Sequence, residues 1–203
     1  MDRLSAMTSK LTYLALPILA LLALQCKTEN PKQNQPPSRV VAVKAAPAAP
    51  VSLPEFCDFL DLDGTQKKLN LPEVIDPLTH TKTGYRWINI WATWCGPCIA
   101  EMPTLVTMVD GLKKSGKDLS IEFVAAEEDP EKLKRFYKSR RSFPATGRLA
   151  NPDALKPLIT EIGLDEGAGL PIHIFVDPKG MIRCVRAAAI SPTDISAVKQ
   201  LLK

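Results

Sequence analysis

Residues 91–98 read Trp-Ala-Thr-Trp-Cys-Gly-Pro-Cys, and this stretch decides the fold. The residues that lead into it, 85–91, are aromatic and β-branched enough for a central strand. A helix is expected directly afterwards, over about residues 97–113. The two cysteines, Cys95 and Cys98, therefore stand where a strand passes into a helix.

Two cysteines with this spacing at such a junction have a defined chemistry. Cys95 is expected at the helix N-terminus, where unpaired N–H groups and the positive end of the helix dipole favour a thiolate. Cys98 follows one turn later, close enough to close a disulfide with Cys95. Gly96 lets the backbone approach a partner, and Pro97 costs no hydrogen bond in a first helical turn. The stretch therefore predicts a redox-active pair.

The same spacing also occurs in half of a zinc site and in structural disulfides. Zinc with four ligands needs a second Cys/His pair, and His80 and His173 are far apart and not spaced like ligands. We therefore expect no metal, with His80 at the surface and His173 as an ordinary strand histidine satisfied by its neighbours. Aromatic residues just before the cysteines suit an exposed, substrate-facing site better than a structural disulfide.

The longer segment W-A-T-W-C-G-P-C-I-A-E-M-P, residues 91–103, resembles the active-site segment of the thioredoxin superfamily. In particular it resembles the membrane-anchored TlpA/ResA/CcmG branch, and the resemblance covers residues 53–203. It implies a thioredoxin-like α/β fold, a three-layer sandwich with a mixed central β-sheet. Residues 56–65, with Asp63-Gly64 as a turn signal, predict a hairpin similar to the N-terminal β-hairpin extension of this branch.

The remaining elements are expected from composition and from start and stop signals. Strands are expected over residues 119–126, 172–176 and 181–186, and helices over residues 130–141, from about 153 to 162, and from 191 towards the C-terminus. Strands and helices in this order agree with the fold that the resemblance implies.

The resemblance also implies roles for single residues. Cys95 is the expected nucleophile, and Cys98 is the thiol that resolves the mixed disulfide. Pro171 matches the family's cis-proline, which faces the cysteine pair and leaves the backbone before it free to pair with an extended substrate segment. Trp94, directly beside Cys95, is expected to shield the site. The expected substrate-binding residues are Trp94, Gly96, Pro97 and Leu170.

We expect Glu101 to accept the proton of the resolving thiol. Thioredoxin itself carries a carboxylate on its central strand, but the corresponding place here is Asn89, which cannot act as a base. Glu101 lies one helical turn after Cys98 and matches the glutamate of the TlpA/ResA branch. The alternative is an ordinary exposed helix glutamate.

The first 50 residues carry a targeting pattern. Residues 11–24 form an apolar run that suits a signal peptide but is short of the ~20 residues of a membrane-spanning helix. We expect a signal peptide over residues 1–25, lipidation of Cys26, a Pro-rich linker over 26–50 and a domain over 51–203. Residues 23–25 depart from the lipoprotein pattern, so ordinary cleavage and an uncleaved anchor remain alternatives. All three place the domain on the periplasmic side of a bacterial envelope.

Charge and the remaining cysteines restrict the function further. The net charge is +4, and residues 1–50 supply all of it. The domain is therefore neutral overall, which argues against nucleic-acid binding. Cys57 and Cys184 are left over, an even number in an oxidising compartment. We expect a structural disulfide between them, with two separate buried thiols as the alternative.

These features indicate an extracytoplasmic thiol–disulfide oxidoreductase, a monomer that needs no cofactor besides the Cys95–Cys98 disulfide. The Gly-Pro between the cysteines resembles that of thioredoxin, at the reducing end of the potential series, so we expect a reductase of protein disulfides. The resemblance implies a membrane thiol transporter of the CcdA or DsbD kind as electron donor. It also implies apocytochrome c cysteines or a copper-site assembly protein as acceptors.

Other functions fit the sequence less well. A net oxidase or isomerase differs from a reductase only in redox potential, and this alternative stays open. A copper-handling module would carry a C-x-x-x-C with a distal histidine, or Met/His clusters, and the sequence has neither. A non-catalytic lipoprotein would not need the full set of Cys95, Cys98 and Pro171. In a peroxiredoxin the reactive cysteine stands alone.

Overall fold

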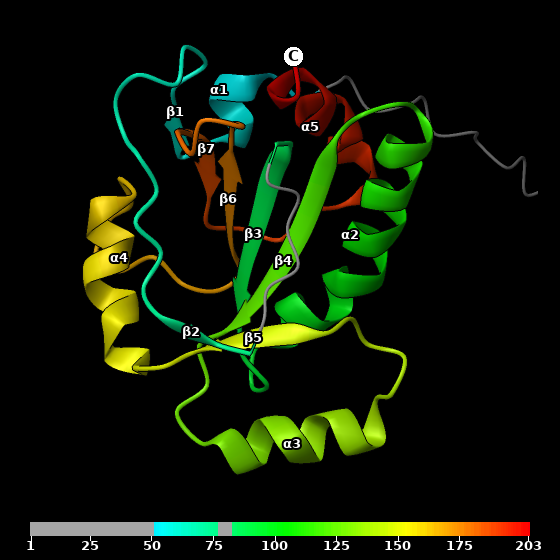
Figure 1. Ribbon diagram of the computed structural model, residues 1–203, viewed down its shortest axis with the longest axis vertical. Coiled ribbons are helices and arrows are strands. Elements are labelled where there is room, and N and C mark those ends of the chain that lie inside the picture. The colour runs from blue at the N-terminus through cyan, green and yellow to red at the C-terminus, as the bar shows by residue number, and fades with distance from the viewer. Residues whose placement is uncertain (1–50, 77–82) are drawn as a thin grey trace, which may run out of the picture. The chain divides into compact units, whose positions relative to one another are not determined.

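The computed structural model describes residues 51–76 and 83–203 (Figure 1). The expected signal peptide, Cys26, the linker over residues 26–50, and His80 lie outside these described residues. Within them, no helix combines the length and the apolar character that crossing a membrane requires.

Helices separate most of the strands along the described part of the chain, except that β1, β2 and β3 follow one another, as do β6 and β7 (Figure 1). The strands are β1 (Phe59–Leu60), β2 (Val74–Ile75), β3 (Tyr85–Trp91), β4 (Leu119–Ala125), β5 (Thr146–Leu149), β6 (Ile172–Val176) and β7 (Ile182–Arg186). The α-helices are α1 (Leu53–Phe56), α2 (Gly96–Lys114), α3 (Pro130–Ser139), α4 (Leu155–Glu161) and α5 (Ile195–Leu201). Short 3-10 turns at Pro152–Ala154 and Pro192–Asp194 lead into α4 and α5.

All seven strands belong to one mixed sheet. Their order is β1-β7-β6-β3-β4-β5-β2. The pairs β3–β4 and β4–β5 are parallel, and the other neighbours are antiparallel. The strand that leads to the cysteines, β3, therefore lies at the centre, where both faces of a sheet are buried.

Helices cover both faces of the sheet, because the side chains of β3 alternate between two apolar cores. Trp87 and Trp91 point to the core that α2 and α5 close, whereas Ile88 and Ile90 point to the core under α4. Figure 1 shows α4 on one side of the strands and α2 on the other. The predicted three-layer sandwich with a mixed central sheet is confirmed.

The N-terminal extension differs from the expected hairpin. Strand β1 pairs with β7, with Leu60 opposite Cys184, and not with a strand next to it in the sequence. Further along, Lys68 forms an isolated bridge with Met181. Residues 58–69 therefore run along the free edge of β7 as a single antiparallel partner that a turn interrupts.

The turn within this segment is built by Asp61. Its buried carboxylate accepts hydrogen bonds from the backbone N–H groups of Gly64, Thr65 and Gln66, at 3.2, 2.8 and 2.8 Å. These hydrogen bonds hold the pKa of Asp61 below its usual value despite burial, and the bond from Gln66 has the largest effect on this pKa. The Asp-Gly signal thus marks a loop in an edge strand, and both arms satisfy their hydrogen bonds on β7.

Candidate active site

Cys95 is the N-cap of α2, the helix that follows the central strand. Its Sγ accepts a hydrogen bond from the backbone N–H of Cys98 at 3.3 Å. The two cysteines form a disulfide with their Cα atoms 5.3 Å apart. Once this disulfide is reduced, the N–H group and the helix dipole favour negative charge on the sulfur of Cys95. Cys98 is fully buried beneath it, and Cys95 is 4% exposed.

An exposed rim surrounds the cysteine pair. Trp94 is 68% exposed, which is unusual for so large an apolar side chain. Gly96 and Pro97 are also exposed, and a side chain at Gly96 would meet nothing within 4 Å. The rim therefore leaves the backbone around Cys95 open to a partner, and Trp94 offers it an apolar contact.

Pro171 lies at the same end of the sheet as the cysteines. Strand β6 begins beside the point where β3 ends, since Ile172 pairs with Ile90. Pro171, the residue before β6, is buried, and the Leu170–Pro171 peptide bond is cis. Leu170 is half-buried and packs against both apolar cores. Leu170 and Pro171 are far from the cysteines in the sequence, and the antiparallel pairing of β3 with β6 brings them to the end of the sheet where α2 begins.

Glu101 is buried, 5% exposed, and not an exposed helix glutamate. Its Oε2 accepts a hydrogen bond from the backbone N–H of Ile190 at 2.7 Å, and its Oε1 accepts one from Nδ2 of Asn89 at 3.1 Å. Asn89, at the position where thioredoxin has its acid, thus holds the carboxylate that α2 supplies. Glu101 follows Cys98 by one helical turn, so both side chains lie on the buried side of α2.

His173 is a site residue that sequence reasoning missed. It pairs with Asn89 across β3 and β6. Its Nδ1 accepts a hydrogen bond from Nε1 of Trp87 at 3.1 Å, and its Nε2 lies 3.3 Å from Oε1 of Glu101. No spacing in the sequence indicates this contact, because it depends on the register between two strands more than 80 residues apart.

A second carboxylate, Glu127, fixes the loop that leads to Cys95. It follows β4, is almost fully buried, and accepts hydrogen bonds from the backbone N–H of Thr93 at 3.2 Å and from the Thr93 hydroxyl. The sequence shows Glu127 only as the first residue of an acidic run, which is usually solvated. Parallel pairing of β3 and β4 brings their two ends together.

The disulfide expected between Cys57 and Cys184 is present. The Cα atoms are 5.6 Å apart, and 127 residues separate the two cysteines in the sequence. Cys57 follows α1 and Cys184 lies on β7, so the bond joins the N-terminal extension to the sheet. Among the described residues, no group of three or more His, Cys, Asp or Glu side chains is placed to hold a metal ion.

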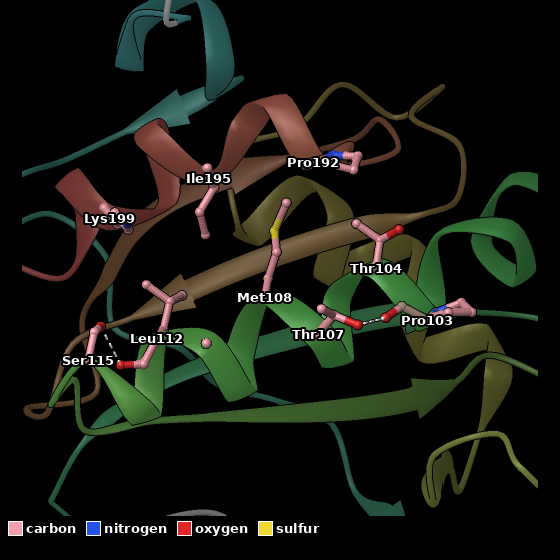
Figure 2. Close-up of a pocket in the computed structure, with 10 residues that line it drawn as sticks. Pro103, Thr104, Thr107, Met108, Leu112, Ser115, Pro192, Ile195 and Lys199 are labelled. Carbon is pink, nitrogen blue, oxygen red and sulfur yellow. Dashed lines mark hydrogen bonds between the residues drawn. The ribbon is translucent and has the colours of Figure 1, made fainter.

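A groove of about 510 Å³ lies between α2 and α5, away from the cysteine pair (Figure 2). Figure 2 shows Met108 and Leu112 of α2 facing Ile195 of α5 across it. The residues that line this groove include none of those placed around Cys95, so it is no part of the active site.

Comparisons with known proteins place the chain among dithiol oxidoreductases. No protein-family model matches it. The thiol:disulfide interchange protein HelX of Rhodobacter capsulatus is 31% identical over 155 residues, which cover 74% of this chain and 72% of HelX. The thiol:disulfide interchange protein DsbE homolog of Paracoccus denitrificans is 31% identical over 100 residues, covering 49% and 48%. A solved thioredoxin domain of a thiol-disulfide oxidoreductase from Bacteroides vulgatus aligns with a TM-score of 0.48 and 22% identity, covering 60% of this chain and 81% of that one.

The central strand, the cysteine pair at the start of α2 and the proline before β6 define a thioredoxin-fold protein with a redox-active disulfide. The chain belongs to the thiol:disulfide interchange proteins of the HelX and DsbE type. These are thiol–disulfide oxidoreductases of the CcmG/DsbE/TlpA branch, as the active-site segment predicted.

Proposed function

We propose that the protein reduces disulfides of partner proteins on the periplasmic side of the envelope, with Cys95 as nucleophile. The observation that carries this proposal is the place of Cys95 at the N-terminus of α2, where its sulfur accepts the N–H of Cys98. The thiolate of Cys95 attacks the partner disulfide, forms a mixed disulfide and releases one partner thiolate. Cys98 then attacks the sulfur of Cys95, which closes the internal disulfide and releases the second thiolate.

Glu101 is the residue that we propose to take the proton of Cys98 before this second attack. Its burial and its place one turn after Cys98 support this role. Asn89 and the backbone of Ile190 donate hydrogen bonds to the buried carboxylate, which compensate for its removal from water. Proton transfer from thiol to carboxylate leaves the total charge of the site unchanged.

The exposed rim is the surface on which we propose that the partner binds. Trp94 offers an apolar contact, and Gly96 and Pro97 leave room for a polypeptide close to Cys95. The backbone of Leu170, just before β6, would pair with an extended segment of the partner, as in strand addition. Pro171 would then lie between that segment and the sheet.

The N-terminal sequence pattern and the resemblance of the active-site segment support a proposal on the surroundings of the protein. We propose a signal peptide over residues 1–25, a membrane anchor through lipidated Cys26, and a spacer over 26–50 that joins it to the domain of 51–203. The electron donor would be a membrane thiol transporter of the CcdA or DsbD kind. The acceptors would be apocytochrome c cysteines or a copper-site assembly protein. No cofactor beyond the Cys95–Cys98 disulfide is needed for this chemistry.

Cysteine variants test the assignment of roles. The reduced protein should reduce a disulfide-bonded peptide, Cys95→Ser should abolish the reaction, and Cys98→Ser should accumulate a mixed disulfide on Cys95 that mass spectrometry detects. If Cys95→Ser stays active and Cys98→Ser is inactive, the roles are inverted. Equilibration with glutathione then measures the redox potential of the Cys95–Cys98 pair, which indicates the direction of electron flow. A potential near the value of about −270 mV for thioredoxin supports a reductase, whereas one near about −120 mV, as in DsbA, identifies an oxidase.

A further inference from the structure

A fully buried histidine, His173, stands behind Glu101 and has no part in the proposed steps. It is the second residue of β6 and faces the core that α2 and α5 close. Its ring packs against Trp87, with centroids 5.9 Å apart, and Trp87 in turn packs against Phe175. Burying an ionisable ring beside a buried carboxylate costs free energy unless hydrogen bonds compensate for the lost hydration.

The hydrogen bonds of the ring fix the position of its proton. The indole Nε1 of Trp87 is a donor only, and it donates to Nδ1 of His173 at 3.1 Å. The amide nitrogen of Asn89 lies 3.3 Å from the same Nδ1. Nδ1 is thus the acceptor, and the neutral ring carries its proton on Nε2, an assignment that rests on these two partners.

The proton on Nε2 is directed to the side where Glu101 lies. Nε2 is 3.3 Å from Oε1 of Glu101, and it has no aligned hydrogen-bond partner among residues 51–76 and 83–203. A buried N–H group without a partner costs free energy, and the acceptor close by is this carboxylate. A small rotation of the Glu101 side chain would give the pair a charge-assisted hydrogen bond.

We propose that His173 is a positioning residue, which donates a hydrogen bond from Nε2 to the Glu101 carboxylate and so holds it in place to accept the proton of Cys98. The inference rests on the proposed function, in which Glu101 takes the proton of Cys98. The ring N–H is then the third donor at the carboxylate, after the amide of Asn89 and the backbone of Ile190. Donors that face a carboxylate favour its ionised form over the acid.

Besides His173, the groups around Glu101 are two uncharged donors and a thiol. Strand β3 contributes the uncharged Asn89, the segment before α5 contributes a backbone N–H, and α2 itself contributes Cys98. In the part of the chain that the structure describes, His173 is the ionisable side chain within ion-pair distance of Glu101, and no lysine or arginine pairs with it.

Three variants separate the donor from the packing. His173→Gln keeps an N–H donor near the place of Nε2, and His173→Met fills a similar volume without a donor. His173→Asn keeps a partner for Trp87 but does not reach Glu101, so it serves where the methionine variant fails to fold. Phe175→Leu is the matched control, because Phe175 lies on the same strand and face and packs against Trp87 with centroids 4.7 Å apart.

The experiment follows the two chemical steps separately between pH 5 and pH 9. Reduced full-length protein is mixed with one equivalent of a disulfide-bonded peptide. Samples are quenched with acid and alkylated, and mass spectrometry measures the fractions of mixed disulfide and of closed Cys95–Cys98 disulfide over time. We expect His173→Met and His173→Asn to slow closure of the Cys95–Cys98 disulfide about tenfold below neutral pH, the effect of losing one hydrogen bond to a charged group. The midpoint of the pH–rate profile should move to higher pH. His173→Gln should restore most of the rate, and Phe175→Leu should keep the wild-type profile.

Superimposable pH profiles for wild type and the methionine or asparagine variant would overturn the inference. So would an equal loss in Phe175→Leu, because packing would then explain the effect, or an equal loss in His173→Gln, because the donor would not matter. The proposed function fails in a different way: the wild-type protein would then form no mixed disulfide on Cys95 at any pH.

Discussion

Two buried carboxylates hold the ends of the short segment that carries the cysteines. Glu127 accepts hydrogen bonds from Thr93, which lies before Cys95, and Glu101, which follows Cys98 on α2, accepts one from the distant backbone of Ile190. Each carboxylate accepts N–H groups from a different part of the chain. The cysteine pair is thus held in place from both sides before a partner binds, which is the arrangement that lowers the cost of ordering a reactive site.

Removing the carboxylate of Glu127 should loosen the loop before Cys95. In Glu127→Ala, the N–H and hydroxyl of Thr93 lose their acceptor, and one unsatisfied polar group that stays buried costs about 1–3 kcal/mol. We expect a lower urea midpoint and slower formation of the mixed disulfide. Glu127→Gln keeps an oxygen acceptor and should lose less. The neighbouring Glu128 is exposed, and an equal loss of stability in Glu128→Ala would reject this account.

Glu101→Gln should slow the resolving step and also lower stability. Both oxygens of Glu101 accept hydrogen bonds, from Asn89 and from Ile190, and a glutamine offers one oxygen and one NH₂ group. One donor would then face another donor, which costs about 1–3 kcal/mol. Closure of the Cys95–Cys98 disulfide should become slow over the whole pH range, with mixed-disulfide formation intact. An unchanged pH–rate profile would remove Glu101 from the mechanism.

At the level of elements, the sequence predicts the strands and helices that have strong local signals, but it does not predict the short strands at and beside the edges of the sheet. The central strand was expected over residues 85–91 and is Tyr85–Trp91, and the helix expected over about 97–113 is Gly96–Lys114. The sequence does not indicate the short strands β2 and β5, and the prediction of a hairpin over residues 56–65 is wrong. A strand of two to four residues at or beside the edge of the sheet takes its register from its partner, so its own sequence has too few residues to show a period of two.

The residues of the candidate site also differ in whether the sequence can indicate them. The cysteines and Pro171 stand in local motifs, and Glu101 stands one turn from Cys98, so sequence reasoning could place all four. His173 and Glu127 come to the site only through pairing with β3, on its two sides. Such contacts are tertiary, and a single sequence contains no spacing that announces them.

The connection from α3 to β5 supports a prediction on pH. Tyr137 of α3 donates its hydroxyl to the carbonyl oxygen of Pro144 at 2.7 Å. Burial raises the pKa of Tyr137 to about 12, and the smaller effect of a hydrogen bond with Thr146 lowers it. The unfolded chain loses this proton near pH 10, so the unfolded state binds fewer protons between pH 10 and pH 12. The stability that the protonated hydroxyl contributes is therefore present below pH 10 and is lost as pH rises towards 12.

Tyr137→Phe removes this titration. We expect the variant to be about 1 kcal/mol less stable than wild type at pH 8, from the lost hydrogen bond. The difference should fall towards zero as pH rises above 10, because only wild type loses stability there; the slope is less than ~1.4 kcal/mol per pH unit because solvent screens the half-buried hydroxyl. Urea unfolding of both proteins at pH 8, 10 and 11 measures it. Curves that stay a constant distance apart would show that Tyr137 titrates normally.

At the scale of the whole molecule, the N-terminal extension is joined to the sheet by three kinds of contact. Strand β1 pairs with β7, the Cys57–Cys184 disulfide lies beside that pairing, and Arg186 donates to the carbonyl oxygen of Phe56 at 2.7 Å. Arg186 also lies over the ring of Phe56. A two-residue strand is weak alone, so the covalent bond is the contact that keeps the extension on the edge of β7.

Removing that bond should lower stability without stopping the chemistry at Cys95. The bond closes a loop of 127 residues, for which chain entropy gives at most about 5 kcal/mol, and removing native disulfides typically costs about 2–5 kcal/mol. We expect such a loss of unfolding free energy in Cys57→Ala/Cys184→Ala, measured in urea. Both proteins that are compared carry Cys95→Ala/Cys98→Ala, so that they have the same active site.

The same double variant with Cys95 and Cys98 intact should still form the mixed disulfide at the wild-type rate, because both removed cysteines lie outside the contacts that hold Glu101 and Thr93. Equal urea midpoints with and without the bond would mean that β1 pairing alone holds the extension, and a lost mixed disulfide would mean that the extension shapes the active site.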